Sequence, residues 1–186
     1  MEKFYLKRIT QNDKNIIIDY IQEFYMHNSR INGVGRLQDY INKGIQNFEL
    51  WFEKIKKEET EPFTKICYLF IRQNDAQLIG MVNIRMVKDL KDYQYGHIGY
   101  SIRPTERNKG YGKIQLYQAL KELEKNNIEQ CQMNCESNNI GSKKIIKSLG
   151  GIFEKNIDTE EYYLINVSNS LKDNFEKYSK YTTYNI

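Results

Sequence analysis

One stretch, residues 95–112, places the strongest constraint on what this chain can fold into. Apolar residues alternate with small or polar ones over residues 98–102, which predicts a buried β-strand. A basic turn containing Gly110 and Gly112 follows and leads into a helical pattern of leucines. The N–H groups at a helix start have no partner inside the helix, and glycines let an anion approach the backbone closely. We therefore predict that this strand, turn and helix hold a phosphate group.

Composition indicates one domain and excludes several classes of function. The chain has 186 residues, of which 40% are hydrophobic, and 15 tyrosines and 8 phenylalanines add apolar area. A net charge of +4 is too weak to indicate a nucleic-acid partner. Cys67, Cys131 and Cys135 form no even disulfide framework and no metal site with nearby histidines. Without a signal-like or membrane-length apolar run, we expect a cytoplasmic protein with no membrane partner and no metal.

The apolar periodicity predicts a mixed sheet with helices on both faces, in the order β-α-α-β-β-β-α-β-α-β-β. A single domain is expected over residues 1–167, followed by a C-terminal extension, residues 168–186, with one short helix. Strands are predicted at residues 4–9, 66–72, 77–87, 95–104, 128–135, 152–155 and 161–167, and helices at 13–26, 37–57, 112–125 and 139–149. The polar residues 88–94 read as a connection.

Two common phosphate-binding loops do not match the glycine turn. A Walker A loop requires a glycine where Arg107 stands, and Ser or Thr where Ile114 stands. The dinucleotide fingerprint requires a third glycine where Gln115 stands, and no strand-first βαβ unit opens the chain.

The glycine turn and the segments around it resemble the GNAT superfamily of acyl-CoA-dependent N-acyltransferases. Residues 107–112 are similar to its Arg/Gln-x-x-Gly-x-Gly/Ala pyrophosphate loop, and residues 96–104 resemble the strand before it in a bacterial subgroup. About 30 residues on, Asn139 to Ser142 and then Leu149-Gly150 resemble the second signature of the family. The resemblance is good over residues 78–155. It implies the GNAT fold, an α/β mixed sheet of about six to seven strands that splays between the fourth and fifth strands.

The resemblance also implies an acetyl-CoA site. Pantetheine would pair with the backbone near Ile102, the pyrophosphate would lie on the N–H groups of residues 108–113, and Asn139 would hydrogen-bond the pantetheine arm. The residues expected to bind the cofactor are Ile102, Arg107, Asn108, Lys109, Gly110, Tyr111, Gly112, Lys113, Asn139 and Ser142.

The acceptor in such enzymes is an amine, which must lose a proton to attack the thioester. His97 is one candidate base, because imidazole titrates near neutrality and some GNAT members carry a glutamate there. Glu136 is the second candidate base. The alternative for His97 is a structural histidine hydrogen-bonded under a loop, and the alternative for Glu136 is a carboxylate that stabilises a helix start.

Two further positions bear on catalysis and substrate. Many GNAT enzymes carry a tyrosine where this chain has Ile146, so the usual acid for the leaving thiolate is missing. Asn83 and Arg85 lie on one face of a predicted strand, where they could orient an acceptor or form a buried structural pairing. The acceptor pocket is expected around residues 28–36.

The leading hypothesis is an N-acetyltransferase that acts on a primary amine of a small molecule or peptide. A GNAT-fold sensor or scaffold that binds acyl-CoA without turnover is the alternative, and a nucleotide-phosphate-binding protein of another class is the third. The chain is expected to be a monomer or homodimer, with the tyrosine-rich tail as a possible contact to a second subunit.

Overall fold

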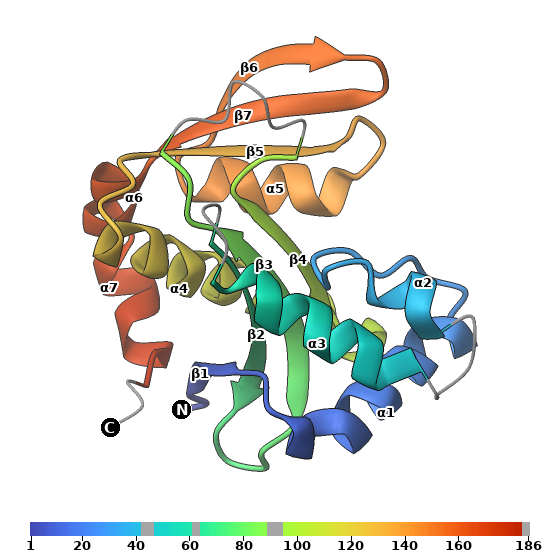
Figure 1. The fold of residues 1–186 in the computed structure, drawn as a ribbon. Coiled ribbons are helices and arrows are strands. Elements are labelled where there is room, and N and C mark those ends of the chain that lie inside the picture. The colour runs from blue at the N-terminus through green and yellow to red at the C-terminus, as the bar shows by residue number, and fades with distance from the viewer. Residues whose placement is uncertain (42–46, 61–63, 89–94, 184–186) are drawn as a thin grey trace.

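A computed structural model describes residues 1–41, 47–60, 64–88 and 95–183. Its strands form two antiparallel sheets, ordered β1-β2-β3-β4 and β5-β7-β6 (Figure 1). The strands are β1 (Phe4–Arg8), β2 (Lys65–Arg72), β3 (Leu78–Arg85), β4 (Ile98–Ile102), β5 (Gln130–Glu136), β6 (Ile152–Ile157) and β7 (Glu160–Asn166).

Helices lie on both faces of the larger sheet (Figure 1). They are α1 (Lys14–Met26), α2 (Leu37–Ile41), α3 (Phe48–Glu58), α4 (Tyr111–Lys125), α5 (Ile140–Ser148), α6 (Val167–Asp173) and α7 (Phe175–Tyr178), with short 3₁₀ turns at Gln11–Asp13, Pro104–Glu106 and Ser179–Tyr181. None of the helices in these described ranges has the length and hydropathy that crossing a membrane requires.

Strands β2 and β3 are buried on both faces, as their nearly continuous apolar sequence requires. Cys67 and Leu69 pack with α1 and α3, while the alternating Ile66 and Tyr68 pack with α4. The core on the α4 side extends to β5, α5 and β7, so the smaller sheet is joined to the larger one through shared apolar side chains.

The predicted α/β fold class is confirmed, and the element order is as expected. The sheet is divided in two between β4 and β5. The predicted helix over residues 37–57 is represented by α2 and α3, and residues 42–46 between them lie outside the described residues. Most of the connection expected at residues 88–94 also lies outside them. Strand β4 begins at Ile98, three residues later than predicted.

The C-terminal segment packs against its own domain. Val167 and Leu171 of α6 join the core beside α4, and the rings of Tyr178 and Tyr117 lie 5.6 Å apart. The N–H of Thr183 donates to the Phe4 carbonyl at 2.9 Å, next to the edge of β1. The domain boundary at residue 167 stays a prediction.

Candidate active site

The fourth strand has one paired edge and one edge that no strand covers in the described residues. On the paired side, Arg85 N–H donates to the His97 carbonyl and Arg103 N–H to the Ile79 carbonyl, both at 2.8 Å. Bonding alternates along an antiparallel strand, so the backbone groups of Tyr100 and Ile102 point to the other edge.

The two sheets touch where β4 begins and diverge beyond that point (Figure 1). The N–H of His97 donates to the Gln132 carbonyl at 2.7 Å, and the N–H of Gly96 donates to Asn134 Oδ1 at 3.0 Å. From there β4 runs toward the start of α4 and β5 runs toward the start of α5. An extended molecule could therefore add to the open edge of β4 with both helix N-termini beside it.

The turn before α4 has the backbone that its sequence predicts. Asn108 and Gly110 adopt left-handed conformations, with φ of 63° and 86°, and the helix starts at Tyr111. Residues 107–110 are exposed. Arg107, Lys109 and the first N–H groups of α4, which have no partner inside the helix, thus lie in one exposed turn, which suits an anion.

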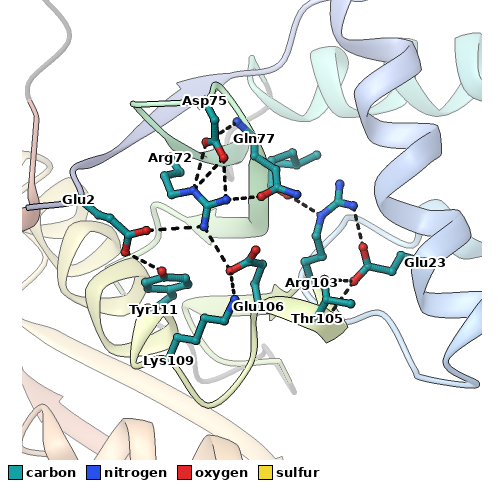
Figure 2. Close-up of polar contacts among 11 residues, drawn as sticks. Glu2, Glu23, Arg72, Asp75, Gln77, Arg103, Thr105, Glu106, Lys109 and Tyr111 are labelled. Carbon is teal, nitrogen blue, oxygen red and sulfur yellow. Dashed lines mark hydrogen bonds and ion pairs between the residues drawn. The ribbon is translucent and has the colours of Figure 1, made fainter.

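A buried carboxylate anchors this turn to the β2–β3 hairpin (Figure 2). Glu106 is only 7% exposed and accepts from Arg72 Nη1 at 3.2 Å and Lys109 Nζ at 2.8 Å. Arg72 also donates to Asp75 at 2.6 Å. The Tyr111 hydroxyl donates to Glu2 at 2.6 Å. The position of the loop is therefore set by residues far away in the sequence.

A second ionic cluster fixes the end of β4 to α1 (Figure 2). Arg103 is 5% exposed and donates to Glu23 at 2.7 Å and to Asp19 at 2.9 Å. Glu23 also accepts from the Thr105 N–H and hydroxyl, at 2.9 and 2.8 Å. Burial raises the pKa of Glu23, but these hydrogen bonds and the Arg103 charge outweigh it and hold the pKa below its ordinary value.

Helix α5 packs against the start of α4. The Asn139 side chain caps α5 by accepting from the Ser142 N–H at 3.0 Å, and its amide nitrogen takes no part in that cap. A Cβ on Gly112 would come within 2.6 Å of the Ile145 Cδ1, so glycine permits this close approach of the two helices. Ile146 is fully buried in the core.

Both ring nitrogens of His97 are engaged. Nδ1 accepts from the Gln132 N–H at 2.9 Å, so Nε2 carries the proton and donates to the Val87 carbonyl at 2.9 Å. Burial outweighs these bonds and lowers the pKa of His97. With no free lone pair on the ring, this geometry gives the predicted base role no support and matches the alternative of a histidine bonded under a loop.

The loop after α1 reaches both ends of the site. Arg30 Nη1 lies 2.6 Å from Glu136 Oε1 at the end of β5, and both side chains are substantially exposed. At the other end, Arg107 Nη2 donates to the Ser29 hydroxyl at 2.8 Å. Arg107 also donates through Nε to the Ile102 carbonyl at 3.1 Å and lies over the Phe24 ring. The loop thus lies beside the open edge of β4.

Glycines bring this loop into contact with β4. Gly33 has φ of 73°, and a Cβ there would fall 2.3 Å from the Gly99 carbonyl oxygen and the Tyr100 nitrogen. A Cβ on Gly99 would likewise fall 3.2 Å from the Gly33 Cα. Only a glycine at residue 33 can lie this close to the strand.

The two predicted acceptor-orienting side chains make structural contacts. Asn83 is buried and donates to Cys67 Sγ at 2.9 Å, and Arg85 Nη1 donates to the Gly96 carbonyl at 2.6 Å. Burial raises the pKa of Cys67 to about 11, so it remains a thiol. These contacts correspond to the buried pairing that the sequence left open.

The model of the acetyltransferase (GNAT) domain family matches residues 5–152 of this chain. The chain belongs to the GNAT acetyltransferase family. The family resemblance seen in the sequence is therefore confirmed, and the predicted enzyme class, an acyltransferase, is confirmed with it. No curated protein shows a significant sequence match to the chain.

Solved structures of GNAT enzymes share the fold at low sequence identity. RimJ from Mycobacterium smegmatis, solved in complex with CoA-disulfide, is 10% identical, with a TM-score of 0.70 over 92% of this chain and 87% of that one. Mutant forms of the spermidine/spermine N-acetyltransferase SpeG from Vibrio cholerae are 14% identical, with a TM-score of 0.65 over 92% and 98%. Ribosomal-protein-S5-alanine acetyltransferase from Vibrio fischeri is 18% identical, with a TM-score of 0.62 over 87% and 92%.

GNAT acetyltransferases use acetyl-CoA, which agrees with the cosubstrate predicted for this chain. Within the described ranges, no group of three or more His, Cys, Asp or Glu side chains is placed to hold a metal ion. The sequence predicted the glycine turn before α4 and the helix start at Asn139. It did not reveal the ion pairs of Glu106, Arg103 and Arg30, because no local pattern marks an ion pair between distant residues.

Proposed function

We propose that this protein transfers an acetyl group from acetyl-CoA to a primary amine of a small molecule or peptide by direct attack of the amine on the thioester. The observation that carries the proposal is the open edge of β4 ending beside the cationic turn at the start of α4. Pantetheine carries amides that can pair with such an edge, and its pyrophosphate matches an N-terminal helix site.

Different residues along this edge would bind different parts of acetyl-CoA. Of the backbone N–H groups predicted over residues 108–113, those of residues 108–112 would bind the pyrophosphate, aided by Lys109, whereas the Lys113 N–H donates to the Gly110 carbonyl at 3.1 Å. The backbone of Ile102 would pair with the pantetheine, and the amide nitrogen of Asn139 would donate to it. The Tyr100 N–H points to the same open edge and would stabilise the developing oxyanion.

The acceptor would enter along the loop that carries Arg30 and Gly33. Of the two candidate bases, Glu136 fits better than His97, because its side chain is partly exposed and the His97 ring is engaged on both sides. Glu136 could take the proton directly or through water once the acceptor competes with Arg30 for it. Structural neighbours act on a ribosomal protein and on polyamines, in keeping with an amine acceptor.

The test combines binding and turnover. Acetyl-CoA is expected to raise the melting temperature of the wild-type protein, and thiol release is expected with at least one member of a panel of polyamines, amino acids and peptide N-termini. Lys109→Ala should raise the Kd for acetyl-CoA roughly tenfold, because a charge-assisted contact to phosphate is lost. Lys177→Ala, which removes an exposed lysine from α7, is the matched control.

A sensor that binds acyl-CoA without turnover remains the second candidate, favoured by Ile146 in the usual position of the acid and by the engaged His97. Binding of acetyl-CoA with no thiol release across the panel would favour it. A melting shift with ATP and none with acetyl-CoA would contradict both functions.

A further inference from the structure

One buried hydroxyl on β4 has no hydrogen-bond partner among the described residues. It belongs to Tyr100, whose ring packs against the core shared by α4, β5 and α5. Leaving a buried hydroxyl unpaired is destabilising, so such a group is expected to have a partner that the free protein lacks. The other unpaired buried side chain in the described ranges, Gln115, lies under Gly80 in the closed part of the sheet.

The Tyr100 side chain extends from β4 against a core that contains residues of β5 and α5. Ser142 in the first turn of α5 and Cys135 near the end of β5 are close enough to affect its ionisation. The Ser142 hydroxyl nevertheless makes no hydrogen bond of normal geometry to it. Burial raises the pKa of Tyr100 far above its ordinary value, so the hydroxyl stays protonated across the working pH range.

The chemistry of thioester cleavage supplies a partner for this hydroxyl. As the C–S bond breaks, negative charge develops on sulfur, and a buried thiolate needs a donor. The usual tyrosine is absent, because Ile146 occupies its place and is fully buried. Ser142 lies one helical turn before Ile146 on α5, so the Tyr100 hydroxyl reaches the neighbourhood of the missing group from the opposite strand.

We propose that the Tyr100 hydroxyl is a catalytic residue that donates a hydrogen bond to the sulfur of CoA as it leaves. This inference rests on the proposed function. The amine nitrogen forms a bond to the thioester carbon, and collapse of the adduct breaks the C–S bond and leaves the electron pair on sulfur. The Tyr100 proton remains on the phenol oxygen, the proton from the amine passes to the base or to water, and the thiolate is protonated by water after release.

The experiment compares Tyr100→Phe with the wild type and with Tyr5→Phe, a hydroxyl removal on β1 away from the site. Tyr100→Phe is expected to lower kcat about 10- to 100-fold, with the KM for acetyl-CoA changed less than about threefold, because a hydrogen bond to a charged group is lost mainly in the transition state. Tyr5→Phe should keep the wild-type kcat.

A second measurement reads the sulfur directly. The thiol pKa of CoA bound to each protein, followed by ultraviolet absorbance of the thiolate, should be lower in the wild type than in Tyr100→Phe, because the hydroxyl stabilises the thiolate. This readout needs no acceptor amine and remains decisive if no amine in the panel reacts.

The outcomes separate this inference from the proposed function. Absence of acetyl-CoA binding by the wild type would remove the proposed function, and the role of Tyr100 with it. Normal binding, with equal kcat and equal bound-thiol pKa in wild type and Tyr100→Phe, would overturn only the role of Tyr100. The role of Tyr100 would also be overturned if Tyr100→Phe changed neither kcat nor the bound-thiol pKa while Ser142→Ala lowered kcat and raised that pKa.

Discussion

At the scale of single residues, His97 joins three backbone segments that are distant in sequence. Its ring connects the segment just after β3, through Val87, to β5, through Gln132, while its own backbone directly precedes β4. The neutral imidazole is a donor on one side and an acceptor on the other, which is what these two partners require. A protonated ring would have two donors, and one would face the Gln132 N–H.

This geometry predicts a pH dependence of stability. The pKa of His97 is lowered in the folded protein, so the unfolded state binds the proton more readily. The contribution of His97 to the free energy of unfolding should have its full value above about pH 6.5, the ordinary pKa of histidine. It should be lost as the pH drops through the folded-state pKa. Urea titrations between about pH 7 and pH 5 measure this, above the range where most carboxylates titrate.

The chain's other histidine is a matched control, because His27 is exposed at the end of α1. His97→Gln should be destabilised by roughly 1–3 kcal/mol at pH 7 and should lose most of the slope, since a buried polar contact is broken. His27→Gln should keep the wild-type slope. A His97→Gln protein with an unchanged slope would contradict the assignment.

At the scale of elements, the strand–turn–helix from residue 95 was predictable because its information is local. Alternation marks the strand, two glycines mark the turn, and leucine spacing marks the helix. The engagement of His97 and the anchoring of Glu106 were not predictable, because each depends on which distant segments pack together. The division of the sheet followed from family resemblance, since no residue in β4 or β5 signals by itself that two strands diverge.

A substitution at Gly33 tests the contact between the loop after α1 and β4. Gly33→Ala combines a left-handed backbone with a Cβ that would overlap the backbone of Gly99 and Tyr100. The overlap can be relieved only by moving the loop off β4. We expect a loss of roughly 2–4 kcal/mol in unfolding free energy and a higher KM for the acceptor, with the Kd for acetyl-CoA changed much less.

Gly150→Ala separates strain from overlap. Gly150 also has a left-handed backbone, with φ of 82°, but a Cβ there would meet no atom within 4 Å. Gly150→Ala should lower the free energy of unfolding by about 1 kcal/mol, with no change in the KM for the acceptor. If the two variants behave alike, the contact between Gly33 and β4 does not matter for the site.

At the scale of the whole molecule, the C-terminal segment closes the side of the domain opposite the loop after α1 (Figure 1). The Phe4 carbonyl accepts from both Gln118 of α4 and Thr183 of the tail, at 2.9 Å each, so β1, α4 and the tail share one backbone atom. Phe4 also stacks on Phe70 and lies 4.8 Å from Tyr111, the first residue of α4. The tail therefore supports the same helix whose start carries the cationic turn.

The tail's contribution can be measured with two aromatic residues of the same helix. Tyr178 packs against Tyr117, whereas Phe175 is 55% exposed. Tyr178→Ala should lower the free energy of unfolding by roughly 2–3 kcal/mol through lost apolar burial and ring contact, and Phe175→Ala should change it by less than about 0.5 kcal/mol. Because Tyr178 lies far from the open edge of β4, kcat should be unchanged below the melting transition. Destabilisation by Phe175→Ala and none by Tyr178→Ala would mean that the tail packs in another way, and the support it gives to α4 would have to come from elsewhere.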